Sequence, residues 1–215
     1  MRTGLIIEIE TLLFDTDTLR AAALDTALRQ EGVLVPYDDV FQAHTGRSAR
    51  MALHGIAAAR SVDGIGRDLV LRRTADAVTR SLASGAPSFD ARVRDALVEL
   101  AGEFPLGAVT RSDAAEARWL LELAGLDSAF LTIRSLAELE DPDHHTSWSE
   151  ASARLRADRS VAFGPAPLMP AAQQAGLATV QVGDSTDVRT DARLASLTQL
   201  DASFVASLFD GRRNS

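Results

Sequence analysis

Two glutamates stand at the end of the first hydrophobic run of the chain. Glu8 and Glu10 follow the run Leu5-Ile6-Ile7 and are separated by one isoleucine. Side chains alternate with a period of two along a β-strand, so a strand through this run directs both carboxylates to the same side. Two acids at the mouth of a buried strand can bind a divalent cation or take part in phosphoryl transfer. Glu8 and Glu10 are therefore the first candidates for catalytic and metal-binding residues.

Further polar residues come at the ends of later hydrophobic runs. Four such runs predict short strands, near residues 105–110, 130–133, 160–163 and 178–182. The first of these strands ends at Thr110, with Arg111 next in the chain, and Arg134 follows the second. The carboxyl ends of parallel strands lie at one edge of a sheet, where ligands bind. We therefore expect Thr110, Arg111 and Arg134 near the glutamate pair.

Helical patterns separate these strands and also fill a long segment after the first one. Residues 17–83 show three stretches of helical spacing, ending near 32, around 51–56 and over 68–82. Strands separated by helices imply right-handed crossovers and a doubly wound parallel sheet. The sequence predicts an α/β core over 1–16 and 88–210, an inserted all-helical cap over 17–87, and a disordered tail over 211–215.

Composition and charge narrow the class of protein. The chain has 215 residues, 46% of them hydrophobic, a net charge of −8 and no cysteine. The negative charge argues against nucleic acid and anionic membranes as partners. No apolar run reaches the roughly 18–20 residues that span a bilayer, and no signal peptide opens the chain, so we expect a cytoplasmic protein. All 22 basic residues are arginine, and any role that demands a lysine is vacant.

This arrangement resembles the haloacid dehalogenase superfamily, in its branch of β-phosphoglucomutase-like and phosphoglycolate phosphatase-like proteins. Members open with a strand, then Asp-x-Asp-Gly-Thr-Leu, then Asp-Thr or Asp-Ser at the entry to a helical cap. The matching segments here are Glu8-Ile9-Glu10-Thr11-Leu12-Leu13 and Asp15-Thr16. The resemblance covers nearly the whole chain and implies a Mg²⁺ cofactor and a small phosphorylated metabolite as substrate.

The resemblance assigns a role to each residue at the strand ends. Glu8 takes the place of the aspartate that is both nucleophile and metal ligand, and Glu10 the place of the general acid/base. The extra methylene of Glu8 moves its oxygens by about 1 Å or more, and such a displacement can cost roughly 10²-fold in rate. Thr110 matches the hydroxyl residue that hydrogen-bonds the transferring phosphoryl group.

The lysine of the family, usually in a Lys-Pro pair, has no counterpart. Asp141-Pro142 aligns with it, which reverses the charge at a place where phosphoryl charge needs stabilisation. Arg111 or Arg134 could supply a cation instead, although the longer, planar guanidinium does not reproduce the geometry of lysine. Alternatively, both arginines are surface charges at strand ends.

The acidic pair that completes the Mg²⁺ shell of the family is also missing. Gly164-Pro165 stands where it belongs, with no carboxylate. Gly183-Asp184-Ser185-Thr186-Asp187 has the form of that acidic motif, but it comes one crossover too late, and too little chain remains beyond it for the usual helix and strand. We therefore expect Asp184 and Asp187 to be loop acids.

Within the predicted cap, His44-Thr45-Gly46-Arg47-Ser48 resembles the loop that sets substrate choice. His44, Gly46 and Arg47 are thus candidate substrate-binding residues, with Arg47 able to contact an oxyanion. A glycine turn followed by a helix N-cap at Ser48 explains the same residues.

Two functions follow from these patterns. The favoured one is a phosphatase- or phosphomutase-type protein whose catalysis is impaired, a pseudoenzyme that binds a ligand or a protein partner. The alternative is an active Mg²⁺-dependent phosphatase with a remodelled site, in which Glu8 is nucleophile or metal ligand, Thr110 holds the phosphoryl group, and Arg111 or Arg134 replaces the lysine.

Overall fold

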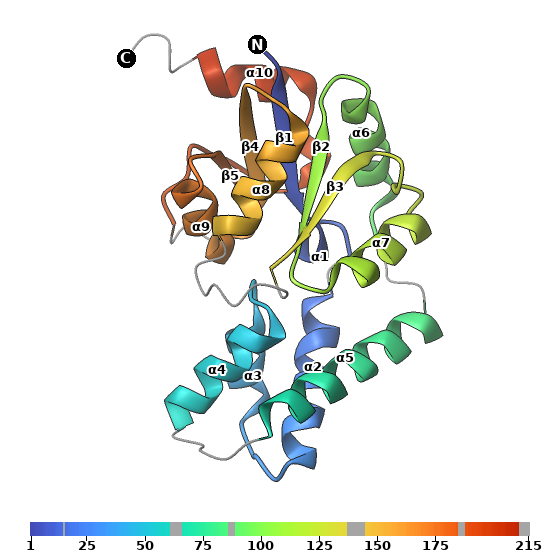
Figure 1. Ribbon diagram of the computed structural model, residues 1–215, viewed down its shortest axis with the longest axis vertical. Helices are drawn as coiled ribbons and strands as arrows, with labels where there is room; N and C mark the ends of the chain where they lie inside the picture. The colour runs from blue at the N-terminus through green and yellow to red at the C-terminus, as the bar shows by residue number, and fades with distance from the viewer. Residues whose placement is uncertain (15, 61–65, 86–88, 137–144, 185–187, 211–215) are drawn as a thin grey trace. The chain divides into compact units, whose positions relative to one another are not determined.

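The computed structural model shows an α/β part and a helical part (Figure 1). The structure describes residues 1–14, 16–60, 66–85, 89–136, 145–184 and 188–210. The chain divides into two compact units. The α/β unit comprises Met1–Phe14 and Phe89–Ser215, and the helical unit comprises Asp15–Ser88. Among the described residues, no helix is long and apolar enough to cross a membrane.

Over the described part of the chain, the α/β unit is built on a parallel sheet of six strands, which confirms the predicted fold class. The strands are β1 Thr3–Glu8, β2 Leu106–Thr110, β3 Phe130–Ser135, β4 Arg159–Gly164, β5 Ala178–Val182 and β6 Ala192–Leu194. Their order across the sheet is β3-β2-β1-β4-β5-β6. Strand β1 therefore lies between β2 and β4, and Ile7 is in register with Ala108 on one side and Phe163 on the other.

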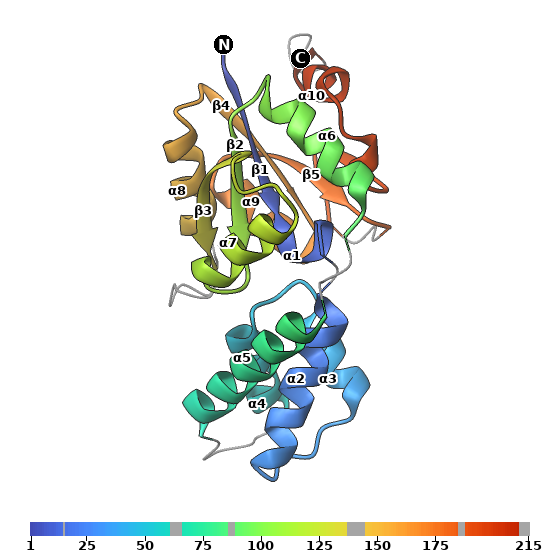
Figure 2. The same cartoon turned by 90° about the vertical axis from the view of Figure 1, so that its right-hand side faces the viewer.

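Helices cover both faces of this sheet, with α8 on one side and α6 and α10 on the other (Figure 2). The helices of this unit are α1 Ile9–Leu12, α6 Ala91–Ala101, α7 Ala114–Leu123, α8 His145–Leu155, α9 Met169–Gln174 and α10 Ala202–Asp210. Helices α6 and α7 have side-chain N-caps: the Asp90 carboxylate accepts from the Arg92 N–H and the Asp113 carboxylate from the Glu116 N–H.

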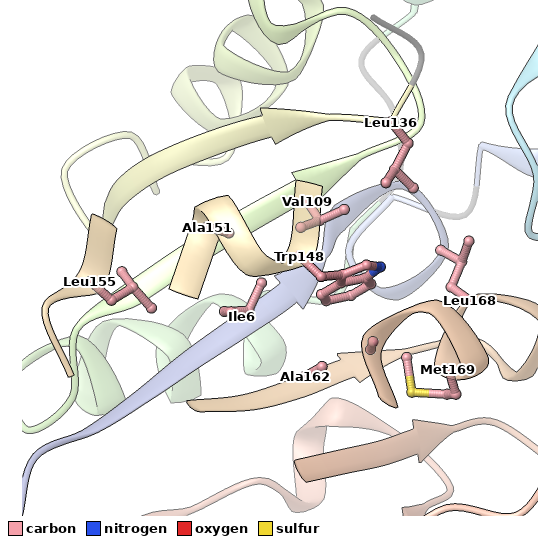
Figure 3. Close-up of a cluster of buried hydrophobic side chains, with 10 residues drawn as sticks. Ile6, Val109, Leu136, Trp148, Ala151, Leu155, Ala162, Leu168 and Met169 are labelled. Atoms are coloured by element: carbon pink, nitrogen blue, oxygen red, sulfur yellow. The ribbon is translucent and has the colours of Figure 1, made fainter. Parts of the chain in front are cut away.

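The hydrophobic core beside α8 is centred on Trp148, whose side chain is fully buried. It packs with residues from three neighbouring strands, as Figure 3 shows for Ile6, Val109 and Ala162. Leu168 and Met169, at the start of α9, complete the cluster. Because side chains alternate along a strand, Glu8 emerges from β1 on the same face as Ile6, on the side of this core where the strands have their carboxyl ends.

The described residues of the helical unit form four helices where the sequence predicted three. They are α2 Asp17–Gln30, α3 Tyr37–His44, α4 Ala49–Arg60 and α5 Arg67–Ser84. The unpredicted helix, α3, carries apolar residues at helical spacing, Tyr37, Val40 and Phe41, but it has only eight residues, fewer than a periodic pattern needs to stand out in a sequence. The core of this unit includes Leu24, Leu28 and Leu53.

Two local predictions were wrong. The first strand does not extend to Glu10: β1 ends at Glu8, and residues 9–12 form one helical turn, closed by the Leu13 N–H on the Ile9 carbonyl at 3.0 Å. The chain beyond residue 184 does contain a further strand and helix, β6 and α10. Strand β6 has only three residues, too few to show an alternating pattern in a sequence.

Candidate functional site

Glu8 and Arg111 form a buried ion pair at the carboxyl ends of β1 and β2. Glu8 is the last residue of β1 and Arg111 follows the last residue of β2, so the pairing of these neighbouring strands brings both to one place. The Arg111 Nε donates to Glu8 Oε1 at 2.8 Å. The two side chains are 1% and 0% exposed. The carboxylate at the nucleophile position is thus bound to a guanidinium inside the protein.

Glu10 reaches the same place from the helical turn α1 rather than from a strand. Its Oε1 atom accepts hydrogen bonds from the Thr110 hydroxyl, from the Ser112 N–H at 2.9 Å and from the Ser112 hydroxyl at 2.8 Å. Thr110 and Glu10 are both fully buried. The hydroxyl that the resemblance assigned to a phosphoryl group therefore donates to a side chain of the protein itself.

Serine side chains extend this network toward α8. The Ser135 hydroxyl, at the end of β3, donates to the Ser112 carbonyl. The Ser147 hydroxyl, in the first turn of α8, donates to the Ser135 carbonyl at 2.9 Å. Sequence reasoning missed these three serines. Ser112 and Ser135 stand at strand ends, as Thr110 does, but nothing in the sequence distinguishes them from ordinary loop serines.

Burial controls the protonation of Glu8. Loss of hydration raises the pKa of its carboxyl from the usual 4.5 to about 7, because an ionised carboxylate is poorly solvated inside the protein. The guanidinium of Arg111 lowers this pKa, and the neighbouring carboxyl of Glu10 raises it. At neutral pH the Glu8 carboxyl is therefore distributed between its protonated and ionised forms.

This raised pKa predicts a pH-dependent stability. The folded protein holds the Glu8 proton more tightly than the unfolded chain does, so the stabilising contribution is complete below about pH 4.5 and is lost as the pH rises to about 7. We expect Glu8 to lower the free energy of unfolding over that interval by on the order of 3 kcal/mol. Urea unfolding at several pH values gives the free energy of unfolding of the wild type and of Glu8→Gln as a function of pH. The difference between the slopes of these two curves against pH measures the contribution of Glu8.

The exposed Glu122 provides a matched control for that measurement. Glu122→Gln should leave the pH dependence of the wild type unchanged. Equal slopes for the wild type and Glu8→Gln between pH 4.5 and 7 would show that Glu8 has an ordinary pKa in the folded protein.

On the other side of Glu8, the end of β4 is filled by apolar groups. A Cβ atom added to Gly164 would lie 2.7 Å from the Met169 Cε, 3.6 Å from the Glu8 Cβ and 3.8 Å from the Trp148 ring. Pro165 and Ala166 follow, so no carboxylate comes from this strand end. The position of the family's closing acids is thus occupied by a glycine packed against a methionine.

These residues do not fit a magnesium site. Mg²⁺ needs several oxygen ligands in octahedral geometry, with carboxylates supplying most of the protein charge. Here one carboxylate is bound to a guanidinium, the other accepts three hydrogen bonds on one oxygen, and β4 supplies no acid. Within the described ranges, no group of three or more metal-ligating side chains of His, Asp or Glu comes together.

Arg134 pairs with Glu150 on α8, and β2 lies between its strand and that of Glu8. Arg134 is in register with Val109 and so lies on the face of the sheet that α8 covers. Its Nε is 3.3 Å from Glu150 Oε2 on α8, and its side chain is 24% exposed. Asp184 is exposed after β5, which is separated from β1 by β4. Asp141-Pro142 and Asp187 lie outside the described residues.

The predicted substrate-binding residues His44, Gly46 and Arg47 belong to the helical unit. His44 is buried, with its Nδ1 4.0 Å from Asp17 Oδ1. Gly46 has a φ of 67°, which favours glycine, and Arg47 is exposed beside it. The Ser48 hydroxyl accepts from the Met51 N–H at 3.3 Å. The glycine turn and the helix cap are both present, and the substrate-binding role of His44, Gly46 and Arg47 stays a prediction.

Comparison with known proteins identifies structural neighbours only. No protein-family model matches the sequence, and no curated protein sequence matches it. A β-phosphoglucomutase from Clostridium difficile superposes with a TM-score of 0.82 over 100% of both chains, at 12% identity. A mutant of CbbY from Rhodobacter sphaeroides, crystallised with xylulose-1,5-bisphosphate, gives a TM-score of 0.78 at 16% identity, covering 93% of this chain and 96% of its own.

A 2-haloacid dehalogenase from Pseudomonas syringae pv. Tomato also matches, with a TM-score of 0.58 at 21% identity, covering 99% of this chain and 100% of its own. At such identities a likeness establishes the fold, and the chemistry must be argued from the site.

Proposed function

The chain has the phosphatase- and phosphomutase-like fold of the haloacid dehalogenase superfamily, and from this premise we propose that it is a pseudoenzyme of that fold. In this proposal it does not catalyse Mg²⁺-dependent phosphoryl transfer and instead binds a small phosphorylated metabolite or a protein partner. The buried Glu8–Arg111 ion pair is the observation that carries the proposal. The catalytic alternative requires Glu8 to be ionised, accessible and free to approach a phosphorus atom.

Three features of Glu8 oppose a catalytic role. Its side chain is completely buried, so a substrate cannot reach it without displacing protein groups. Its oxygen is bound to Arg111 at 2.8 Å, and attack on phosphorus would break that bond in a buried, poorly solvated place. Its raised pKa leaves part of the population protonated at neutral pH, and a protonated carboxyl is a poor nucleophile.

The groups that would assist catalysis by Glu8 are hydrogen-bonded to Glu10 instead. The Thr110 hydroxyl and the Ser112 N–H both donate to Glu10, so neither points at an external oxyanion in this arrangement. Glu10 in turn cannot serve as an exposed general acid/base, because it is itself fully buried. The residues at the strand ends are thus hydrogen-bonded to one another, which opposes turnover.

Phosphate release tests this proposal. The purified full chain is incubated with phosphoglycolate and a panel of sugar phosphates, with Mg²⁺ or with a chelator, and the wild type is compared with Glu8→Ala. We expect no Mg²⁺-dependent release above that of Glu8→Ala on any substrate. Mg²⁺-dependent turnover by the wild type that Glu8→Ala abolishes would overturn the proposal and establish a phosphatase.

A further inference from the structure

One flank of the α/β unit carries exposed apolar side chains. Among the described residues, β3 is at the edge of the sheet, and α7 packs against it. Leu123, the last residue of α7, is 46% exposed, and Leu131, the second residue of β3, is 64% exposed. Residues 124–130 separate the two leucines, so both lie where α7 ends and β3 begins. Large apolar side chains that are exposed on neighbouring elements indicate a surface that another molecule covers.

The backbone of β3 at this place is irregular. Phe130 and Thr132 pair with consecutive residues of β2, and Leu131 falls at the register shift between them. A bulge of this kind bends the strand and opposes the addition of a further strand to the edge. A molecule that covers this flank therefore contacts side chains and does not extend the sheet.

Two charges of opposite sign lie on the exposed side of α7. Arg118 and Glu122 are four residues apart, so they lie on the same side of the helix, and both are exposed. Neither of them makes an ion pair with another described residue. Helix α7 thus presents a positive charge and then a negative charge to solvent, directly before Leu123.

We propose that this α7–β3 flank, defined by Arg118, Glu122, Leu123 and Leu131, is the interface of a symmetric dimer formed with a second copy of the chain. A two-fold axis beside α7 makes the two copies of the helix antiparallel. Arg118 of each copy then lies opposite Glu122 of the other copy, which gives two ion pairs across the interface. Contact between the copies removes the leucines beside these pairs from water.

The order of the charges on α7 favours a second copy as the occupant of this flank. An antiparallel pair of identical helices matches a positive with a negative charge twice, without any other protein. Because the chain has a net charge of −8, two copies repel one another at long range, and their contact needs local pairs of opposite charge. The inference goes beyond the proposed function and does not depend on it, because neither Glu8 nor a ligand takes part.

Light scattering after size-exclusion chromatography, repeated at several concentrations of the full chain, tests the dimer. We expect the wild type to dimerise and Leu131→Asp to weaken dimerisation about a hundredfold, because symmetry introduces the change twice and each buried leucine contributes about tenfold. Leu34→Asp is the matched control, because Leu34 is 77% exposed on the helical unit, and it should leave dimerisation unchanged. Leu123→Asp replaces Leu131→Asp if the latter does not fold.

Charge reversal tests the symmetric pairing of the two helices. Arg118→Glu and Glu122→Arg should each weaken self-association by about tenfold, because like charges then face one another twice in the dimer. The first variant has two acids on this side of α7 and the second has two arginines. An equimolar mixture of the two variants should therefore associate as tightly as the wild type, and so should the double variant.

A wild type that is monomeric at every concentration would overturn the inference. A dimer that the aspartate at either leucine position leaves intact would overturn it as well, because the interface then lies elsewhere. Charge-reversal variants that do not associate on mixing would also overturn it, because the pairing of Arg118 with Glu122 across a two-fold axis requires that recovery.

Discussion

Replacing Trp148 with alanine should lower the free energy of unfolding of the α/β unit by about 3–5 kcal/mol. The indole is fully buried between β1, β2 and β4 on one side and α9 on the other, and its removal leaves a cavity among Ile6, Val109 and Met169 (Figure 3). Both the lost apolar burial and the cavity contribute to this cost. Urea unfolding followed by far-UV circular dichroism measures it.

The other tryptophan of the chain, Trp119, provides a control of the same residue type. It lies on α7 and is only partly buried, so Trp119→Ala should cost clearly less than Trp148→Ala. Trp148→Phe should also cost less, because it keeps most of the apolar ring and removes an indole N–H that has no hydrogen-bond partner among the described residues. Equal losses for the two alanine variants would contradict the central place of Trp148 in this core.

Replacing Arg111 with methionine should destabilise the α/β unit by about 3–5 kcal/mol at pH 8, since it leaves the Glu8 carboxylate buried without its countercharge. The cost should be smaller at pH 5, below the raised pKa of about 7, because Glu8 can then be protonated. Urea unfolding at the two pH values measures both effects. A cost that does not change with pH would show that the loss comes from packing rather than from charge.

Much of the fold could be predicted from hydrophobic spacing. The runs near residues 105–110, 130–133, 160–163 and 178–182 predicted strands within two residues of their observed bounds, because buried parallel strands are continuous apolar segments. Helix α3 and strand β6 were not predicted, because the apolar spacing of α3 extends over only eight residues and β6 has only three residues. The helical turn after Glu8 was missed because it continues an apolar run that is also compatible with a strand.

The sequence predicted which residues form the candidate site better than it predicted which of them contact one another. Residue types and strand ends were enough to bring Glu8, Glu10, Thr110 and Arg111 into one hypothesis, and the structure places these four together. The sequence could not show that Arg111 binds Glu8 and that Thr110 donates to Glu10, because side-chain direction at a strand end depends on packing. Arg134 ends β3, with β2 between it and β1, and its Nε lies near Glu150 Oε2 on α8.

The central claim is that the guanidinium of Arg111 neutralises Glu8 inside the protein, and a double-mutant cycle tests it most directly. The free energies of unfolding of the wild type, Glu8→Gln, Arg111→Met and the double variant at pH 8 give the coupling energy of the pair. We predict a favourable coupling of about 2 kcal/mol or more, as expected for charged groups in contact within one buried network. A coupling within about 0.5 kcal/mol of zero, the range of independent sites, would contradict the claim.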